Sequence, residues 1–222
     1  MRGYFFDMDG TLIDSMPNHA KAWKQVMAKY GMCFAPYECY LNEGRTSRDM
    51  IRILADRQGV TVSDEMMEAI YREKTAVYRQ MGDPISVPGV SDLLQYLAKD
   101  PSNQIWVVTG GGQVNLWEQL EQLFPGIFHP EYMITAFDVV HGKPHAEPYL
   151  RAWERSGLNK EECCVIENAP MGIRSGKAAG LFTVGVNTGI LSLNDLHEAG
   201  ADKVFSNMHE LRQWLEDMKT ES

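Results

Sequence analysis

Four groups of polar residues follow short apolar runs, and their types suit a site for a metal ion or an anion. In chain order they are Asp7 and Asp9 in YFFDMDG, Thr109 with Gly110 and Gly111 in IWVVTGG, Lys143 in HGKPHAEPY, and Glu167 with Asn168 in VIENAP. Together they offer two acids, a hydroxyl beside loose backbone amides, one cation and a further pair of oxygens. The spacing of two puts Asp7 and Asp9 on one side of an extended chain, with Met8 facing away.

Each group alone also has an ordinary structural explanation. DMDGT can be the end of a strand followed by a turn, with its two aspartates as capping residues of that turn. TGGG can be a flexible loop. TGGG matches neither a P-loop nor a dinucleotide fingerprint, and a lysine before a proline is usually exposed. Because four complementary groups follow four successive runs, we interpret them as one site.

The elements that must position these groups follow from the apolar pattern. Strands are predicted at 4–7, 105–109, 132–135, 163–167, 182–186 and 203–205, with helices at about 89–99, 113–123, 146–156, 171–179 and 208–218. This alternation predicts an α/β fold, a doubly wound parallel sheet with helices on both faces. Ligands bind at the carboxyl ends of such strands, which is where the four groups stand.

One region, residues 17–82, breaks this alternation and has only helical patterns. We predict a small helical insert at 15–82, within a core formed by residues 1–14 and 83–222. The segment GDPISVPGV (82–90), with two prolines and two glycines, predicts a linker. Two backbone connections would let the insert close over the site.

The composition and net charge limit which classes of partner the protein can have. The 222 residues carry a net charge of -9 and are 44% hydrophobic, as in an ordinary soluble globular protein. The acidic balance argues against nucleic acid or an anionic membrane as the main partner. We find no membrane-spanning run and no signal-peptide pattern, which predicts a cytoplasmic protein. The oligomeric state is not readable, and a monomer is compatible with the sequence.

The cysteines predict neither a disulfide framework nor a zinc site. Cys33, Cys39, Cys163 and Cys164 form no CxxC pair, and no Cys/His cluster has zinc-ligand spacing. We expect them to be buried, reduced thiols.

Taken together, DMDGT, Thr109, Lys143 and the Glu167–Asn168 pair resemble the four motifs of the haloacid dehalogenase (HAD) superfamily. The resemblance covers the whole chain, and the insert resembles that superfamily's cap domain. The segments YFFDMDGTLIDS, HAKAW, GKPHAEPY and GIRSGKAAG are most similar to the β-phosphoglucomutase-like branch.

The resemblance implies a phosphotransferase with a Rossmann-like core. Asp7 would be the nucleophile and become an aspartyl-phosphate. Asp9 would protonate the leaving oxygen and then activate water. Lys143 and Mg²⁺ would offset the negative charge of the phosphate. Phosphate oxygens would be held by Thr109, Gly110 and Gly111. Dehalogenation fits less well, because it needs neither the second acid nor a metal.

Asn168 departs from this branch, which usually has Asp at the metal-binding position. An amide oxygen can still bind Mg²⁺ but brings no charge. Either the metal site is weakened, as in a catalytically weak phosphate-binding protein, or another carboxylate compensates. Glu43, in the glycine-containing loop LNEGRTSRDM of the insert, is the candidate. The metal ligands expected from these arguments are Asp7, Asp9, Glu43, Glu167 and Asn168.

The substrate predictions diverge. Glu43 with Asn168 resembles an inorganic pyrophosphatase of the same branch, so pyrophosphate hydrolysis is the narrow prediction. Arg48, or Arg45, would instead hold the second phosphate of a sugar phosphate, as in a β-phosphoglucomutase or a sugar-phosphate phosphatase. His19 and Lys74 are candidates to face the substrate from the insert, although an ordinary helix surface also explains them. In each case the partner is a small soluble phosphate.

Overall fold

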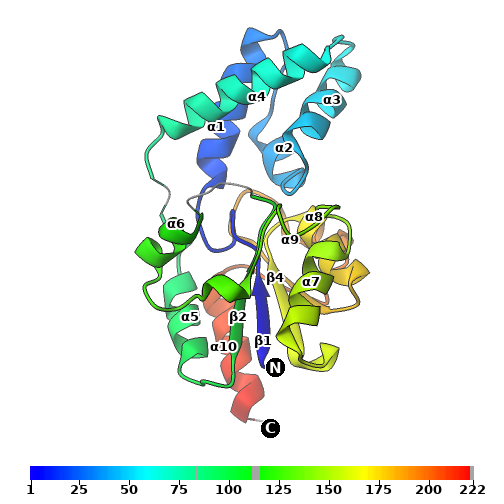
Figure 1. Ribbon diagram of the computed structural model, residues 1–222. Coiled ribbons are helices and arrows are strands. Elements are labelled where there is room, and N and C mark those ends of the chain that lie inside the picture. The colour runs from blue at the N-terminus through cyan, green and yellow to red at the C-terminus, as the bar shows by residue number, and fades with distance from the viewer. Residues whose placement is uncertain (84, 112–115, 221–222) are drawn as a thin grey trace.

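A sheet of six parallel strands forms the core of the molecule (Figure 1). The structure is a computed structural model that describes residues 1–83, 85–111 and 116–220. The strands lie in the order β3-β2-β1-β4-β5-β6. Their bounds are β1 (Gly3–Phe6), β2 (Gln104–Val108), β3 (Met133–Ile134), β4 (Cys163–Glu167), β5 (Phe182–Val186) and β6 (Lys203–Phe205). All six predicted strands and their parallel arrangement are confirmed.

Helices cover both faces of the sheet, as a doubly wound fold requires. One face packs on α5 (Val90–Ala98), α6 (Leu116–Leu123) and α10 (Met208–Thr220), and the other on α7 (Glu147–Ser156) and α8 (Pro170–Ala178). Side chains alternate along a strand, so Tyr4 and Phe6 enter the first apolar core while Phe5 enters the second. Residues 112–115, where a helix at 113–123 was expected to begin, and Pro84 of the expected linker lie outside the described residues.

Residues 16–79 carry four helices and no strand, as the insert prediction expects. We call them the insert helices: α1 (Met16–Lys29), α2 (Pro36–Leu41), α3 (Ser47–Gln58) and α4 (Asp64–Arg79). They lie beyond the carboxyl ends of the strands (Figure 1). Their apolar cluster continues into the core through Ile173, Leu191 and Leu196. Because packing crosses the predicted boundary at 15–82, the division into two domains stays a prediction.

Local sequence signals explain where the insert helices begin and end. The hydroxyl of Thr46 accepts a hydrogen bond from the Asp49 N–H and caps α3. The same helix ends at Gly59, whose φ of 67° lies in the left-handed region that glycine adopts freely. Ser63 caps α4 in the same way as Thr46 caps α3.

Two expectations need correction. The helix α9 (Leu193–Glu198) was not predicted, because a six-residue helix with one buried residue, Leu196, shows no apolar stripe. Cys33 is exposed, whereas Cys39, Cys163 and Cys164 are buried as expected. Cys33 lies in the loop between α1 and α2, and its backbone pairs with the side chain of Gln58.

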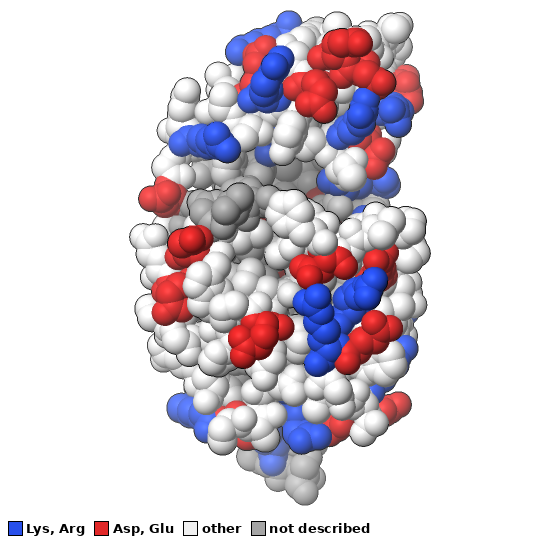
Figure 2. Space-filling model, in the orientation of Figure 1, with Lys and Arg blue, Asp and Glu red and all other residues white. Residues whose placement is uncertain are grey.

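Acidic and basic side chains are interspersed over the insert helices and the core on the face shown in Figure 2. Among the described helices, none is both long and apolar enough to cross a membrane.

Candidate active site

Lys143 lies between two acids at the carboxyl ends of β1 and β4. Its Nζ donates to Asp7 Oδ1, to Glu167 Oε1 at 2.7 Å and to the Val108 carbonyl at 3.0 Å. All three charged residues are almost fully buried. Burial alone would lower the pKa of Lys143, but the adjacent carboxylates of Asp7 and Glu167 raise it, so the lysine stays cationic.

Glu167 uses both carboxylate oxygens to hold this arrangement. Oε1 also accepts from the Tyr149 hydroxyl at 2.7 Å, and Oε2 accepts from the backbone N–H of Asn168 at 3.2 Å. Gly172 in α8 leaves room for the carboxylate, since a Cβ there would lie 1.6 Å from Oε1. These contacts hold Glu167 against Lys143, and a metal-binding role for Glu167 stays a prediction. Tyr149 was not predicted as a site residue, because its position on α7 reads as apolar core.

Asp7 and Asp9 flank Met8, which is buried in the apolar core, as their spacing predicted. Asp7 Oδ2 is buried and has no hydrogen-bond partner. Burial raises the pKa of Asp7, although Lys143 opposes the shift and Glu167 adds to it. Asp9 Oδ1 accepts from the Ser15 hydroxyl at 2.5 Å. Each acid therefore has its own environment, one buried against a cation and one more open.

Asn168 is held by the turn that follows Asp9. The Thr11 hydroxyl donates to Asn168 Oδ1 at 2.8 Å. Gly10 has a φ of 76°, and a Cβ there would lie 2.2 Å from Asn168 Nδ2. Glycine is required here both for the backbone conformation and for the close approach of the amide.

Glu43 reaches this group from the loop between α2 and α3. Asn168 Nδ2 donates to Glu43 Oε2 at 2.9 Å, and Glu43 Oε1 is buried without a partner. Burial, together with the charges of Asp7 and Glu167, raises the pKa of Glu43 well above its usual value. Glu43 therefore lies beside Asn168, while its predicted role as a metal ligand stays a prediction.

Thr109 lies buried at the end of β2, next to the residue whose carbonyl accepts from Lys143. Its Oγ1 accepts from the Gly111 N–H at 3.0 Å, which shapes the start of the loop. Gly110 is exposed between them. The next glycine, Gly112, lies outside the described residues.

The buried Lys74 contacts the partly buried His19 on the insert helices, next to two aromatic rings. Lys74 Nζ lies 2.7 Å from His19 Nδ1, and 5.4 Å and 5.2 Å from the ring centres of Trp23 and Tyr78. His19 Nε2 is 4.0 Å from an oxygen of Asp9. Burial lowers the pKa of Lys74 to about 8, and burial together with Lys74 lowers the pKa of His19 to about 4.

The two predicted arginines make their contacts elsewhere. Arg48 pairs with Asp64 at 2.5 Å on the exposed side of the insert helices. Arg45 Nε donates to Asn42 Oδ1 at 3.0 Å. Neither interaction joins these arginines to the residues around Asn168.

The donor set suits a hard divalent cation. We call Asp7, Asp9, Glu43 and Asn168 the oxygen cluster. Two of its carboxylate oxygens, one on Asp7 and one on Glu43, are buried without any partner. Such atoms are costly unless something binds them. A donor set made only of oxygen atoms fits Mg²⁺ better than a metal that prefers nitrogen or sulfur.

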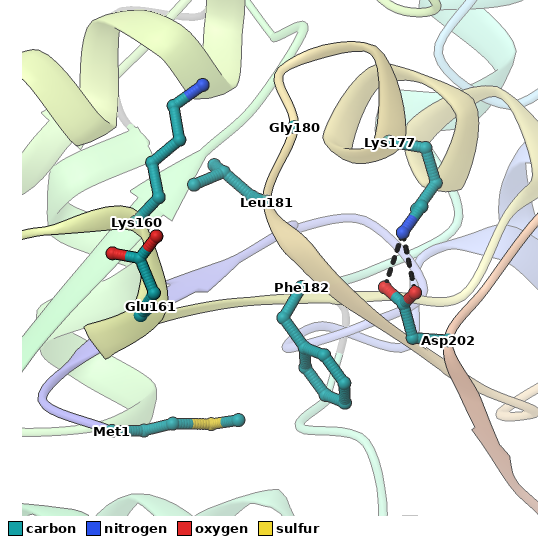
Figure 3. A pocket seen from close by; sticks show the side chains of 8 residues that line it. All are labelled: Met1, Lys160, Glu161, Lys177, Gly180, Leu181, Phe182 and Asp202. Atoms are coloured by element: carbon teal, nitrogen blue, oxygen red, sulfur yellow. Dashed lines mark hydrogen bonds and ion pairs between the residues drawn. The ribbon is translucent and has the colours of Figure 1, made fainter.

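A hollow of about 430 Å³ lies away from this site, at the amino ends of the strands (Figure 3). Its two lysines are already engaged. Lys177 pairs with Asp202 at 2.6 Å, and Lys160 donates to the Ala179 carbonyl at 2.6 Å. Each of these two lysines therefore already has a hydrogen-bond or ion-pair partner within the protein.

Comparison with known proteins agrees with the site. The family described as haloacid dehalogenase-like hydrolase matches residues 1–180. Glycerol-1-phosphate phosphohydrolase 2 of Saccharomyces cerevisiae is 33% identical, over 93% of this chain and 82% of that protein. Hexitol phosphatase A of Escherichia coli is 28% identical, over 84% of this chain and 83% of that protein.

Solved structures show the same architecture. A protein named "Putative beta-phosphoglucomutase" from Bacteroides vulgatus is 40% identical, with a TM-score of 0.90, over 99% of this chain and 89% of that chain. A hydrolase from Pseudomonas syringae is 26% identical, with a TM-score of 0.84, over 98% of this chain and 99% of that chain.

Proposed function

The chain belongs to the haloacid dehalogenase-like hydrolase family, and from this membership we propose that it is a Mg²⁺-dependent phosphohydrolase of a small soluble phosphate. The observation that carries the proposal is the state of Asp7. One carboxylate oxygen of Asp7 is held by Lys143, and the other is buried and unpartnered at the carboxyl end of the sheet. A carboxylate arranged in this way is suited to attack on phosphorus.

The proposed reaction has two steps. A carboxylate oxygen of Asp7 bonds to phosphorus, the bond from phosphorus to the leaving oxygen breaks, and Asp9 gives that oxygen its proton. Water then attacks the phosphorus of the aspartyl-phosphate, Asp9 takes a proton from the water, and phosphate leaves Asp7. Lys143 holds Asp7 in place and offsets negative charge, and Thr109 with its following amides would bind phosphate oxygens.

The oxygen cluster is the proposed metal site. Bound Mg²⁺ would offset the charge of the phosphate oxygens, so that an anionic carboxylate can approach them. Asp7, Asp9, Glu43 and Asn168 would hold it. Glu167 is not in this set, because its oxygens already accept from Lys143, Tyr149 and the backbone.

A small sugar or polyol phosphate is the substrate class that the comparisons support. The relatives include a glycerol-1-phosphate phosphohydrolase at 33% identity and a hexitol phosphatase at 28% identity. A mutase acting on a sugar phosphate would use the same core residues and differ in the group that accepts the phosphate. Hydrolysis is the better-supported reaction, because these two relatives carry the names of a phosphohydrolase and a phosphatase.

Pyrophosphate is a second candidate, favoured by one observation. The contact between Glu43 and Asn168 gives the site an acid supplied by the insert opposite a neutral amide. A core with one fewer fixed negative charge repels a polyanion less. The catalytically weak binding protein stays the remaining alternative, and the presence of both Asp7 and Asp9 argues against it. A cytoplasmic location likewise stays a prediction from the sequence.

Phosphate release tests these proposals. The purified protein is incubated with and without Mg²⁺ and with glycerol 1-phosphate, hexitol phosphates, β-glucose 1-phosphate or pyrophosphate, and Asp7→Asn serves as the inactive control. Mg²⁺-dependent release from the esters supports the first candidate, and preference for pyrophosphate supports the second. Glucose 6-phosphate formed without phosphate release would identify a mutase. Equal results for the wild type and Asp7→Asn on every compound would refute phosphoryl transfer through Asp7.

A further inference from the structure

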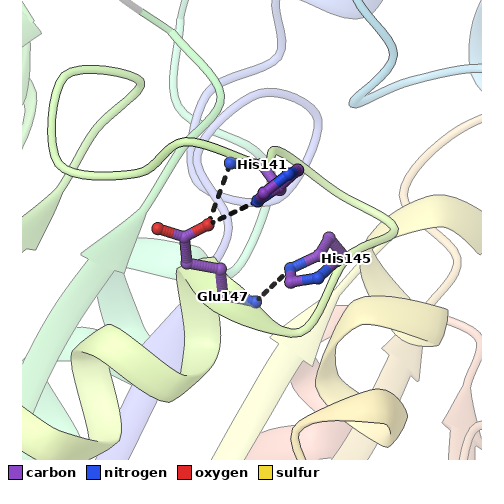
Figure 4. Close-up of side chains that lie close together, drawn as sticks. All are labelled: His141, His145 and Glu147. Carbon is purple, nitrogen blue, oxygen red and sulfur yellow. Dashed lines mark hydrogen bonds and ion pairs between the residues drawn. The ribbon is translucent and has the colours of Figure 1, made fainter.

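The loop that carries Lys143 brings together two histidines and a glutamate that the proposed reaction does not use. His141, His145 and Glu147 each offer one ligand atom, and these atoms lie within 4.8 Å of one another (Figure 4). The centres of the two imidazole rings are 4.7 Å apart. We call these three residues the His–Glu cluster.

Hydrogen bonds hold the carboxylate of the cluster in place. Glu147 Oε1 accepts from the Val140 N–H at 3.0 Å, and Oε2 accepts from the His141 N–H at 2.9 Å (Figure 4). Oε2 is also 3.1 Å from His141 Nδ1. These contacts hold the carboxylate beside the first imidazole.

The second imidazole is hydrogen-bonded to the backbone of the same glutamate. His145 Nδ1 accepts from the Glu147 backbone N–H at 3.1 Å, so this nitrogen is unprotonated. This N–H belongs to the first residue of α7. A backbone N–H at that position has no partner within its own helix and can donate to water instead. A metal ion can therefore take this lone pair without leaving a buried group unsatisfied.

The spacing allows a metal with only side-chain movement. Ligand atoms about 2.1 Å from a tetrahedral metal stand roughly 3.4 Å apart. Both histidines are exposed, so rotation of their side chains can close the remaining gap. His145 and Glu147 also line a surface hollow of about 340 Å³, which leaves room for water ligands.

One positive charge opposes a cation here. Arg151 lies 3.8 Å from Glu147 Oε1. The other oxygen, Oε2, faces His141. The arginine is half exposed and its contact is long, so its competition for the carboxylate is weak.

We propose that His141, His145 and Glu147 form a surface site for a late first-row divalent cation such as Zn²⁺. Imidazole nitrogens with one carboxylate suit Zn²⁺ or Ni²⁺ and do not suit Mg²⁺, so this site is chemically distinct from the oxygen cluster. The sequence did not predict this site, because its two histidines are joined by a glutamate and not by cysteines. A bound ion would join residues 141 and 147 on either side of Lys143.

The test is a calorimetric titration of the intact protein with Zn²⁺, in excess Mg²⁺ to occupy the oxygen cluster. The variants are His141→Ala with His145→Ala, and separately Glu147→Gln. The matched control removes two other exposed histidines, through His129→Ala with His197→Ala. Thermal unfolding of every variant checks that its fold is intact.

The wild type and the control are expected to bind one more equivalent of Zn²⁺ than the double variant. Affinity at this site is expected to fall at least about tenfold in Glu147→Gln, because loss of supporting groups alone weakens metal sites by that much. A second measurement uses the wild type alone, where substoichiometric Ni²⁺ should broaden the ring proton signals of His141 and His145 first. Equal Zn²⁺ binding in the double variant and the wild type, or uniform broadening of all histidines, would overturn the proposal.

Discussion

The side-chain amide of Asn168 donates to the carboxylate of Glu43 at 2.9 Å, which joins the end of β4 to the loop between α2 and α3. An aspartate at position 168 would place two carboxylates at hydrogen-bond distance, where both can stay ionised only with a cation between them. The amide removes that conflict. This contact explains how the loop can approach the sheet when no metal is bound, and it leads to the first prediction.

Asn168→Asp should make the stability of the protein depend on Mg²⁺. Without Mg²⁺ we expect the free energy of unfolding to fall by about 2 kcal/mol, because a hydrogen bond becomes a like-charge contact. Added Mg²⁺ should restore more stability in the variant than in the wild type. Urea unfolding with and without Mg²⁺ measures both effects. The control is Asn207→Asp, since Asn207 is exposed and also lies near a glutamate, Glu210, at 3.4 Å. Equal losses in the two variants would mean that the contact with Glu43 has no special effect.

Glu43→Ala tests the proposed metal ligand directly. We expect Mg²⁺ to bind at least about tenfold more weakly, with a matching rise in the Mg²⁺ concentration that half-saturates phosphate release. Titration calorimetry with Mg²⁺ gives the affinity without reference to substrate. Glu68→Ala, which removes an exposed acid from α4, is the control. If Glu43→Ala kept the Mg²⁺ affinity of the wild type, Glu43 would be a structural contact only.

Asp9→Asn should lower the turnover number by roughly 10²- to 10⁴-fold, the usual contribution of a general acid and base. An amide can neither protonate the leaving oxygen nor accept a proton from water. Steady-state phosphate release on the best substrate measures the loss, with the exposed substitution Asp83→Asn as the control. Turnover near that of the wild type would remove Asp9 from its proposed role.

Lys74→Met should stabilise the protein at neutral pH and impair catalysis. The folded pKa of Lys74 is about 8 and its unfolded value is near 10.5, because burial disfavours the ammonium ion. Below pH 8 Lys74 is protonated in both the folded and the unfolded protein. The free-energy cost of burying its charge therefore does not change with pH there. Between pH 8 and 10.5 only the unfolded state keeps the proton, so the stability of the wild type rises with pH.

The free energy of unfolding of the variant is therefore expected to exceed that of the wild type by about 3 kcal/mol at pH 7, because each pKa unit corresponds to about 1.4 kcal/mol. This advantage should shrink as pH rises through that window. Urea unfolding at pH 7, 8.5 and 10 measures it, and Lys21→Met, at an exposed position, serves as the control. If Lys74 faces an anionic substrate, kcat/KM should fall at the same time. A variant with unchanged stability at pH 7 would contradict the cost assigned to burial.

A comparison of Gly10→Ala with Gly59→Ala distinguishes the free-energy cost of backbone strain from the cost of a steric clash. Both glycines have a positive φ, 76° and 67°, but only at Gly10 would a Cβ meet another group, the Asn168 amide at 2.2 Å. We expect Gly59→Ala to cost about 1 kcal/mol from the left-handed conformation alone. Gly10→Ala should cost more and displace Asn168, which lowers Mg²⁺ affinity. Equal unfolding free energies for the two variants would show that the amide moves away freely.

The sequence was enough to predict the strands and the groups at their ends, because parallel strands bring distant residues to one edge of the sheet. An approach of Glu43 to the metal site was predicted from the resemblance and from the missing charge, and in the structure Glu43 contacts Asn168. The contact between Lys74 and His19 was not expected from the sequence, since it depends on how α1 and α4 pack together. A contact of Arg48 with substrate stays a prediction; in the structure Arg48 pairs with Asp64, a residue on the next helix.

Two residues that contact the acids of the site could not be identified from the sequence, for a similar reason. Tyr149 occupies an apolar position of α7, and only the packed structure brings its hydroxyl to Glu167. Ser15 precedes α1 and reads as a helix cap, yet its hydroxyl donates to Asp9. Local patterns describe what a residue does in its own element, and both contacts lie between elements.

The position of β1 has a consequence for how the chain folds. This first strand is central in the sheet and pairs through Gly3 with Gln104 on one side and with Cys163 on the other. Pairing of such distant segments raises the contact order and slows folding. Until both partners are available, the apolar strand GYFF has two open edges, which are templates for pairing with other chains. The sheet that carries Asp7 can therefore be completed only after both distant segments have paired with this strand.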